Sequence, residues 1–160
     1  MIRIQDDLWF MDLAIKQAEI AYKEKEVPVG AVLVSSNGEV LTQKYNLKES
    51  HHNPTAHAEV LSIIEASKKL SSWRLTGATL YVTLEPCPMC LASMVQARIK
   101  RCVFGAYDAK GGALSLGYHL HNDPRLNHRF SITGGIRHFE CSKLLSQFFK
   151  ERRETYRPKN

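Results

Sequence analysis

The spacing of apolar residues alternates along this chain between that of helices and that of strands. An amphipathic helix is expected over 6–26, because apolar side chains recur there every three or four residues and Pro28 follows. Two β-rich runs, 30–35 and 39–45, lie around Asn37-Gly38, a dipeptide that favours a type I′ hairpin turn. The chain is therefore expected to begin with a helix and a β-hairpin.

The alternation continues to the end of the chain. A second helix is expected to run to about Leu70, with Asn53 as its N-cap and Pro54 as its first residue. The later elements are expected to be a strand at 79–84, a helix at 91–98 introduced by Pro88, strands at 101–106 and 129–133, and a helix from Phe139 to about Arg153. This order predicts one α/β domain over residues 1–160, with a central five-stranded mixed sheet covered by helices on both faces.

Four chemically active side chains fall at the starts of two of these helices. His57 and Glu59 are expected in the opening turn of the second helix, and Cys87 and Cys90 lie next to Pro88 at the start of the third. Helices that follow strands begin at one edge of such a sheet, where ligands bind. We therefore expect all four side chains to meet at that edge.

Three of the four side chains are of types that bind zinc. A structural zinc site is closed by four ligands, whereas a catalytic site has three and leaves room for water. His57, Cys87 and Cys90 supply three, and no fourth Cys or His stands at matching spacing. Glu59 is then free to move protons beside a zinc-bound water. A redox C-x-x-C pair and a structural zinc site are the alternatives.

Charge is distributed unevenly over the 160 residues, whose net charge is +6. Residues 1–97 carry 9 basic and 11 acidic side chains, whereas residues 98–160 carry 13 basic and 5 acidic ones. Near the end of the chain, Phe148 and Phe149 stand close to Arg152 and Arg153. Aromatic rings beside cations suit a polyanion with exposed bases, although a solvated helix end would have the same composition.

The composition also predicts where the protein resides. The apolar runs are too short to span a membrane, and the first residues lack the apolar core of a signal peptide, so a cytoplasmic protein without membrane contact is expected. Thiols stay reduced in that compartment, which argues against a disulfide framework. Cys102 and Cys141, in apolar surroundings, are expected to be small buried side chains.

The pattern formed by 57–59 and 86–90 resembles the H-x-E and P-C-x-x-C signature of zinc nucleobase deaminases. Further segments extend the resemblance over nearly the whole chain, to the bacterial tRNA-specific adenosine deaminase family of the cytidine and deoxycytidylate deaminase superfamily. These segments are 27–32, Asn46, 54–59, 79–87, 104–106, 108–110, 127–129 and 148–149.

This resemblance implies a three-layer α/β/α fold of the cytidine deaminase type and a homodimer that binds the anticodon stem-loop of tRNA. The implied reaction is hydrolytic deamination of the wobble adenosine, position 34 of the tRNA, to inosine. One zinc ion per subunit would be held by His57, Cys87 and Cys90. Glu59 would protonate N1 of adenine, while hydroxide attacks C6, and then help ammonia to leave.

The resemblance also implies which residues bind the substrate. Asn46 would form a hydrogen bond with adenine, and the residues expected to lie against the base are Pro28, Val29 and Ala58. The residues expected to contact the rest of the RNA are Asp108, Lys110, Phe148, Phe149, Arg152 and Arg153. Three positions depart from the family pattern: Asn53 replaces a common acidic residue, Tyr107 a frequent Arg, and Gly111 a frequent Thr.

Two other functions compete with this hypothesis. The first is deamination of a small molecule, either guanine or a cytosine nucleoside, since guanine deaminases share the zinc motif and its flanking residues. The basic C-terminal part argues against it, because a free base needs no surface that binds a polyanion. The second is a zinc-stabilised RNA-binding module without activity. Glu59 argues against that function, because a structural site needs no carboxylate beyond its ligands.

Overall fold

A computed structural model of the protein describes residues 4–156. In these residues the chain forms four helices and five strands. In order, they are α1 (Ile4–Lys23), β1 (Gly30–Val34), β2 (Val40–Tyr45), α2 (Ala58–Lys69), β3 (Thr79–Leu84), α3 (Pro88–Ala97), β4 (Arg101–Ala106), β5 (Ser131–Thr133) and α4 (His138–Thr155). The order of elements predicted from the sequence is confirmed.

The five strands form one mixed sheet in the order β2-β1-β3-β4-β5. The strand β1 pairs antiparallel with both β2 and β3, whereas β3–β4 and β4–β5 are parallel pairs. The two parallel crossovers carry α3 and the long loop before β5. The carboxyl ends of β3 and β4 therefore lie at the same edge as the starts of the segments that follow them.

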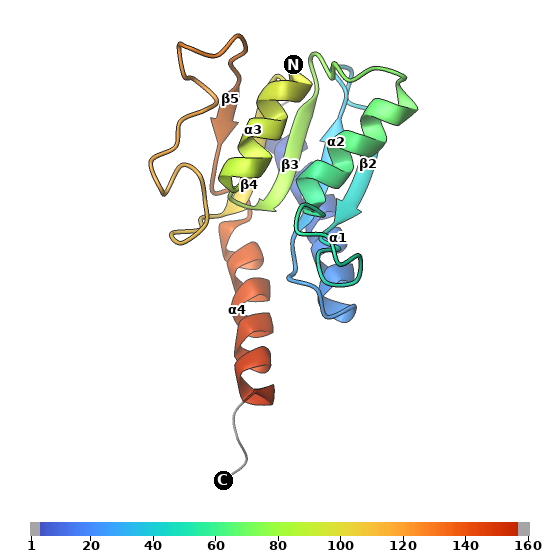
Figure 1. Ribbon diagram of the computed structural model, residues 1–160. Helices are drawn as coiled ribbons and strands as arrows, with labels where there is room; N and C mark the ends of the chain where they lie inside the picture. The colour runs from blue at the N-terminus through green and yellow to red at the C-terminus, as the bar shows by residue number, and fades with distance from the viewer. Residues whose placement is uncertain (1–3, 157–160) are drawn as a thin grey trace.

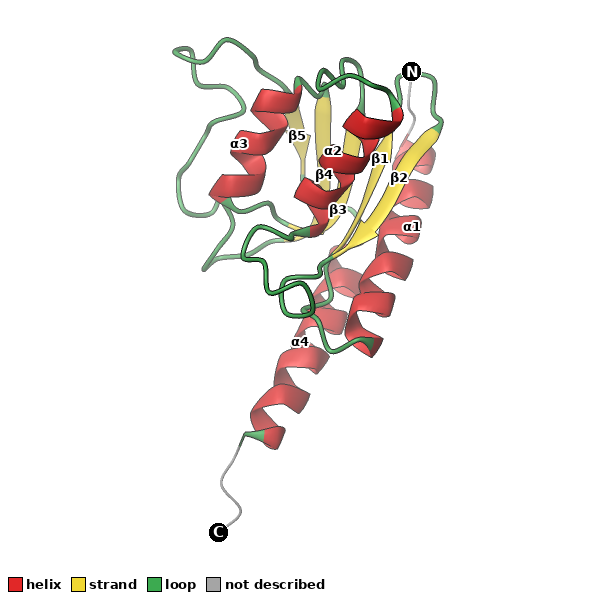
Figure 2. Ribbon diagram, turned by 45° about the vertical axis from the view of Figure 1, so that its right-hand side comes forward, coloured by secondary structure: helices red, strands yellow, loops and turns green. Residues whose placement is uncertain are grey.

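Helices cover both faces of this sheet, which confirms the three-layer arrangement. Figure 2 shows α2 and α3 on one face and α1 and α4 on the other. The strands are buried on both sides, so consecutive residues of β3 belong to different cores: Leu80 and Val82 pack towards α2 and α3, and Tyr81 packs towards α1. Figure 1 shows α4 extending beyond the edge of the sheet at which β3 ends.

The hairpin between β1 and β2 has a different turn from the one predicted. A type I′ turn requires positive φ at both central residues, but only Gly38, with φ of 87°, has it. The amide of Gly38 donates to the carbonyl of Ser35, and the amide of Ser35 donates to the carbonyl of Glu39. The type I′ prediction is therefore wrong, since Asn37 keeps a negative φ and glycine alone takes the left-handed position.

The start of α2 also differs from the prediction. The helix begins at Ala58 with His57 as its N-cap, so Asn53 is not the cap and Pro54 is not helical. Instead, the side chain of Asn53 accepts hydrogen bonds from the amide and hydroxyl of Thr55 within a separate turn. The helix α3 begins as expected, with Cys87 as N-cap and Pro88 as first residue.

A buried carboxylate ties α1 to the sheet. Asp7, 3% exposed, accepts a hydrogen bond from the Tyr81 hydroxyl at 2.7 Å and a two-pronged pair of bonds from the Arg101 guanidinium. The same guanidinium donates to the hydroxyl of Thr133 on β5. This network therefore joins α1, β3, β4 and β5 on the face away from α2 and α3.

The cysteines outside the C-x-x-C pair are structural. Cys102 is fully buried and Cys141 is 2% exposed, and burial raises the pKa of both thiols, to about 12 for Cys141. All four cysteines are free thiols. None of the helices in residues 4–156 is long and apolar enough to cross a membrane.

Candidate active site

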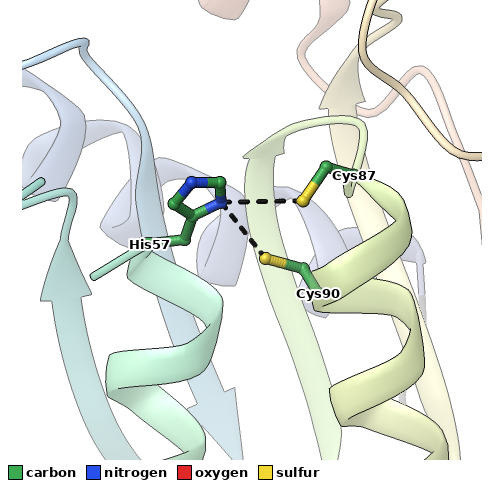
Figure 3. A group of neighbouring side chains, drawn as sticks. All are labelled: His57, Cys87 and Cys90. Carbon is green, nitrogen blue, oxygen red and sulfur yellow. Dashed lines mark hydrogen bonds between the residues drawn. The ribbon is translucent and has the colours of Figure 1, made fainter. Parts of the chain in front are cut away.

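The three predicted metal ligands meet at the sheet edge where α2 and α3 begin. His57 Nδ1 lies 3.7 Å from the sulfur of Cys87 and 3.4 Å from that of Cys90, and all three ligand atoms lie within 4.8 Å of one another. Figure 3 shows the imidazole facing both sulfurs. Ligand bonds of about 2.0–2.3 Å at tetrahedral angles place nitrogen and sulfur roughly 3.5 Å apart, so this set fits one zinc ion.

The start of α3 favours the thiolate form of Cys87. A hydrogen bond from the Cys90 thiol, with a further contribution from His57, lowers the pKa of Cys87 to about 4. The same hydrogen bond, with burial, raises the pKa of Cys90. Zinc ligands must be deprotonated, so Cys87 is prepared for binding and Cys90 would release its proton when the metal binds.

Glu59 lies outside the ligand set but opens into the same site. The carboxylate is in the first turn of α2, is 4% exposed, and is not a member of the cluster of ligand atoms. Burial raises the pKa of Glu59 to about 7. A carboxyl group with such a pKa can both accept and return a proton near neutral pH.

A cavity of ≈ 280 Å³ lies directly above these groups. Small-ligand pockets measure about 300–1,000 Å³, so this one suits a single small ring system. The residues that line it are Val27, Val29, Asn46, Lys48, His57, Ala58, Glu59, Leu84, Glu85, Cys87, Asp108 and Gly111. The residues predicted to surround the base are among them, with one exception.

The exception is Pro28, which is buried and does not line the cavity. Pro28 is the central residue of a tight turn in which the Val29 amide donates to the Val27 carbonyl at 2.8 Å. Val27 and Val29, on either side of this turn, both line the cavity. Val27 was not predicted from the sequence, because a turn of this kind does not follow the alternation of side chains in a strand.

Asn46 has a fixed orientation at the edge of the cavity. The side chain is 7% exposed; its Nδ2 donates to the Val27 carbonyl at 3.3 Å, and its Oδ1 accepts from the Lys48 amide at 3.2 Å. Lys48 was not predicted as a site residue, because an exposed lysine in a loop has no distinguishing pattern. Its place beside the cavity follows from the turn that Asn46 starts.

A second depression continues from the cavity towards α4. This groove shares Val27, Leu84 and Asp108 with the cavity. The other residues that line it are Tyr107, Lys110, Leu145, Ser146, Phe149 and Arg153. The groove thus combines two aromatic rings with two cations beside the base-sized cavity.

The four α4 residues predicted to contact RNA lie on two different faces of that helix. Phe149 and Arg153, four residues apart, line the groove. Phe148 is only 6% exposed and packs against Tyr22 of α1, with Arg152 above its ring at 5.5 Å. The structure therefore does not support direct contact between Phe148 and RNA, because this ring belongs to the contact between α1 and α4.

Comparisons with known proteins agree with this geometry. Residues 4–106 match the family of the cytidine and deoxycytidylate deaminase zinc-binding region. A protein of Bacillus subtilis (strain 168) named tRNA-specific adenosine deaminase is 49% identical over 150 residues, which cover 94% of this chain and 92% of that protein. The chain belongs to the tRNA-specific adenosine deaminase family.

Two solved structures of deaminases are similar to this family member. One, from a study of A-to-I editing by tRNA:A34 deaminases at the wobble position of transfer RNA, is 42% identical, covers 86% of this chain and 99% of its own, and has a TM-score of 0.81. The other, a guanine deaminase from Bacillus subtilis, is 28% identical, covers 95% of this chain and 96% of its own, and has a TM-score of 0.60. Both the sequence and the backbone of this tRNA-specific adenosine deaminase family member are thus more similar to the tRNA enzyme.

Proposed function

We propose that this protein deaminates the wobble adenosine, position 34, of a tRNA anticodon to inosine. One observation carries the proposal: a buried carboxylate, Glu59, lines the same base-sized cavity as His57 and Cys87 without belonging to the His57, Cys87 and Cys90 cluster. A carboxylate placed in this way is what a hydrolytic deaminase needs and a structural zinc site does not. The 49% identity to a relative named tRNA-specific adenosine deaminase supports adenosine in tRNA as the substrate.

His57, Cys87 and Cys90 would hold the zinc ion, and Glu59 would move the protons. The bound metal would supply a water molecule whose pKa is low enough for attack on C6 of adenine at neutral pH. Glu59 would accept one proton of the water and deliver it to N1 as the oxygen bonds to C6. It would then take the remaining proton of the C6 hydroxyl and deliver it to the amine as the C6–N bond breaks. Water and adenosine enter, and inosine and ammonia leave, so atoms and charge balance.

The walls of the cavity would hold the base for this reaction. Val27 and Val29 offer apolar contacts to the ring, and the amide of Asn46 is fixed where it can form hydrogen bonds with the base edge. Asp108, Lys110 and Arg153 would meet the ribose and phosphates of neighbouring nucleotides along the groove. An unpaired loop base can enter at lower cost than a base in a duplex.

The decisive experiment compares substrates for the purified zinc-loaded protein. Total tRNA, free guanine, cytidine and adenosine are incubated separately, and inosine and ammonia are measured. We expect inosine in tRNA and little ammonia from the small molecules. Ammonia from guanine without inosine in tRNA would refute the proposal and leave a guanine deaminase.

We also infer that two copies of the chain associate through α2 and α3. The groove between these helices has an apolar lining that includes Val60 and Ala97, and it exposes Ile64 by 46% and Trp73 by 53%. Exposed apolar surface of this kind is typical of protein interfaces. Light scattering should give a dimer, and Ile64→Arg should give a monomer; a wild-type monomer would refute the inference.

The substrate and the ligands both point to the cytoplasm as the place of the reaction. Transfer RNA is found there, and Cys87 and Cys90 must stay reduced to bind metal. Fractionation of cells that produce the protein should recover it with the cytoplasmic tRNA. Recovery in an oxidising compartment would contradict this assignment.

A further inference from the structure

We propose that Glu85 is a positioning residue, which holds the loop of residues 108–115 against the start of α3. Glu85 thereby sets where Asp108 and Lys110 meet the RNA. The inference rests on the proposed function, because it concerns how the same site places an RNA substrate. It starts from a carboxylate that the reaction itself does not use.

Glu85 is a buried carboxylate that accepts three hydrogen bonds from one loop. It follows β3, is 2% exposed, and stands two residues before the ligand Cys87. Its Oε1 accepts a hydrogen bond from the Ser115 hydroxyl at 2.6 Å and a longer one from the Asp108 amide at 3.4 Å. Its Oε2 accepts from the Ser115 amide at 3.0 Å. The donors thus come from both ends of the 108–115 loop.

The backbone of the loop is fitted closely around this carboxylate. A Cβ added to Gly112 would lie 1.8 Å from Oε2 of Glu85, so only glycine leaves enough room there. The next amide, that of Ala113, donates to the carbonyl of Pro86 at 2.8 Å. The loop therefore contacts the Glu85-Pro86 segment through both a side chain and the backbone.

The positions of Asp108 and Lys110 depend on the contacts of the 108–115 loop with Glu85 and Pro86. Asp108 lines both the cavity and the groove, and Lys110 lines the groove. The Asp108 carboxylate accepts from the amides of Lys110 and Gly111 at 3.1 and 3.0 Å, so the turn is internally stiff. A stiff turn moves as one body, and Glu85 fixes that body relative to Cys87.

Two of the ligands and the proton carrier are held by helices and do not contact the loop through any of the hydrogen bonds above. His57 and Glu59 stand at the start of α2, and Cys90 is inside α3. Release of the 108–115 loop should therefore weaken substrate binding more than the chemical step. In kinetic terms KM should rise while kcat changes little, which distinguishes a positioning role from a catalytic one.

The first test is Glu85→Gln in the zinc-loaded enzyme. The amide keeps the shape of the side chain but turns one acceptor into a donor that faces N–H and O–H groups. We expect faster hydrogen exchange in peptides from 107–118, and a KM for an anticodon stem-loop raised by about tenfold, as for loss of one hydrogen bond to a charged acceptor. The value of kcat and the zinc content should stay close to wild type. The matched control is Glu19→Gln, on an exposed part of α1, where neither measurement should change.

Two further variants separate position from charge. Gly112→Ala pushes the loop away from Glu85 without altering any charge, and Ser115→Ala removes one donor only. If Glu85 acts by positioning, Gly112→Ala raises KM as Glu85→Gln does, and Ser115→Ala raises it less. The double variant Glu85→Gln/Ser115→Ala should then raise KM by less than the product of the two single effects, since both remove the same bond.

Several results would overturn the inference. Unchanged hydrogen exchange in 107–118 for Glu85→Gln would show that the carboxylate does not hold the loop. A fall in kcat at constant KM would make Glu85 part of the chemistry instead. If Glu85→Gln does not fold, Ser115→Ala decides, and an unchanged KM refutes the inference. Failure of the wild-type enzyme to form inosine in the stem-loop refutes the proposed function, whereas the exchange measurement tests Glu85 independently.

Discussion

Two walls of one cavity are held in place by different means. The wall that carries His57, Cys87 and Cys90 consists of two helix starts, whose positions follow from the buried sheet and the packing of α2 and α3 on it. The opposite wall, which carries Asp108, is an irregular loop fixed by hydrogen bonds to the buried carboxylate of Glu85. The chemical groups thus rest on regular elements, and the proposed RNA contacts rest on a loop held by polar bonds.

This difference separates two kinds of variant. Changes on the helix-start wall should affect the chemical step, and changes on the loop wall and α4 should affect RNA binding. Changes in the core on the α1 face of the sheet should affect stability alone.

Glu59→Gln should lower kcat by about 10²–10⁴-fold, the range that general acid–base groups contribute. The amide cannot accept or return a proton, but it preserves the volume of the buried side chain. Zinc content, measured by mass spectrometry of the metal, and affinity for the stem-loop should remain near wild type. Loss of zinc in this variant would mean that Glu59 is a ligand and would refute its proposed role.

Cys87 in metal-free protein should react with iodoacetamide at pH 6. The pKa of Cys87 is lowered to about 4. The thiolate form therefore predominates at pH 6 and is lost only as the pH falls through about 4. Burial raises the pKa of Cys102 and Cys141, and both should stay unmodified. Peptide mapping identifies the site, and added zinc should protect it. Equal labelling of Cys141 would contradict this account.

Asp7→Ala should lower the free energy of unfolding by about 3 kcal/mol, because it leaves the largely buried Arg101 and Tyr81 groups without their partner. The control is Asp12→Ala, whose ion pair with Arg137 is partly exposed and is expected to contribute about 0–1 kcal/mol. Urea denaturation measures both variants. The KM for the stem-loop should be unchanged in each, and a raised KM would show that the two faces of the sheet are not independent.

Arg153→Ala should weaken stem-loop binding and reduce the salt slope of the association constant by about 1, as for loss of one phosphate contact. Arg152→Ala is the matched control, since Arg152 lies over Phe148 on the other face of α4 and should leave the slope unchanged. Titrations at several salt concentrations measure the slope. Equal effects of the two variants would show that RNA does not follow the groove.

The regular wall was the more predictable from sequence. The bounds of β3 and β4 were predicted correctly, because continuous apolar runs with clear ends have few other ways to be buried. Pro88 likewise identified the start of α3, and with it the position of both thiols. His57 and Glu59 were likewise expected at the start of α2, where His57 is the N-cap and Glu59 lies in the first turn.

The remaining details depend on contacts between distant segments. Asn53 was expected to cap α2, but its side chain closes a turn with Thr55 instead, and the two uses have the same local sequence. The separation of Phe148 from Phe149 depends on how α4 packs against Tyr22 of α1, more than a hundred residues away. The donors to Glu85 also lie more than twenty residues away along the chain, so no local pattern identifies them.

Deamination of the wobble adenosine can be observed directly by sequencing total tRNA after reaction with the zinc-loaded enzyme. Inosine is read as guanosine, so each deaminated position is identified. We predict conversion of adenosine at position 34, which the Glu59→Gln variant does not produce. Conversion at other positions, or none in tRNA while free guanine yields ammonia, would contradict the account.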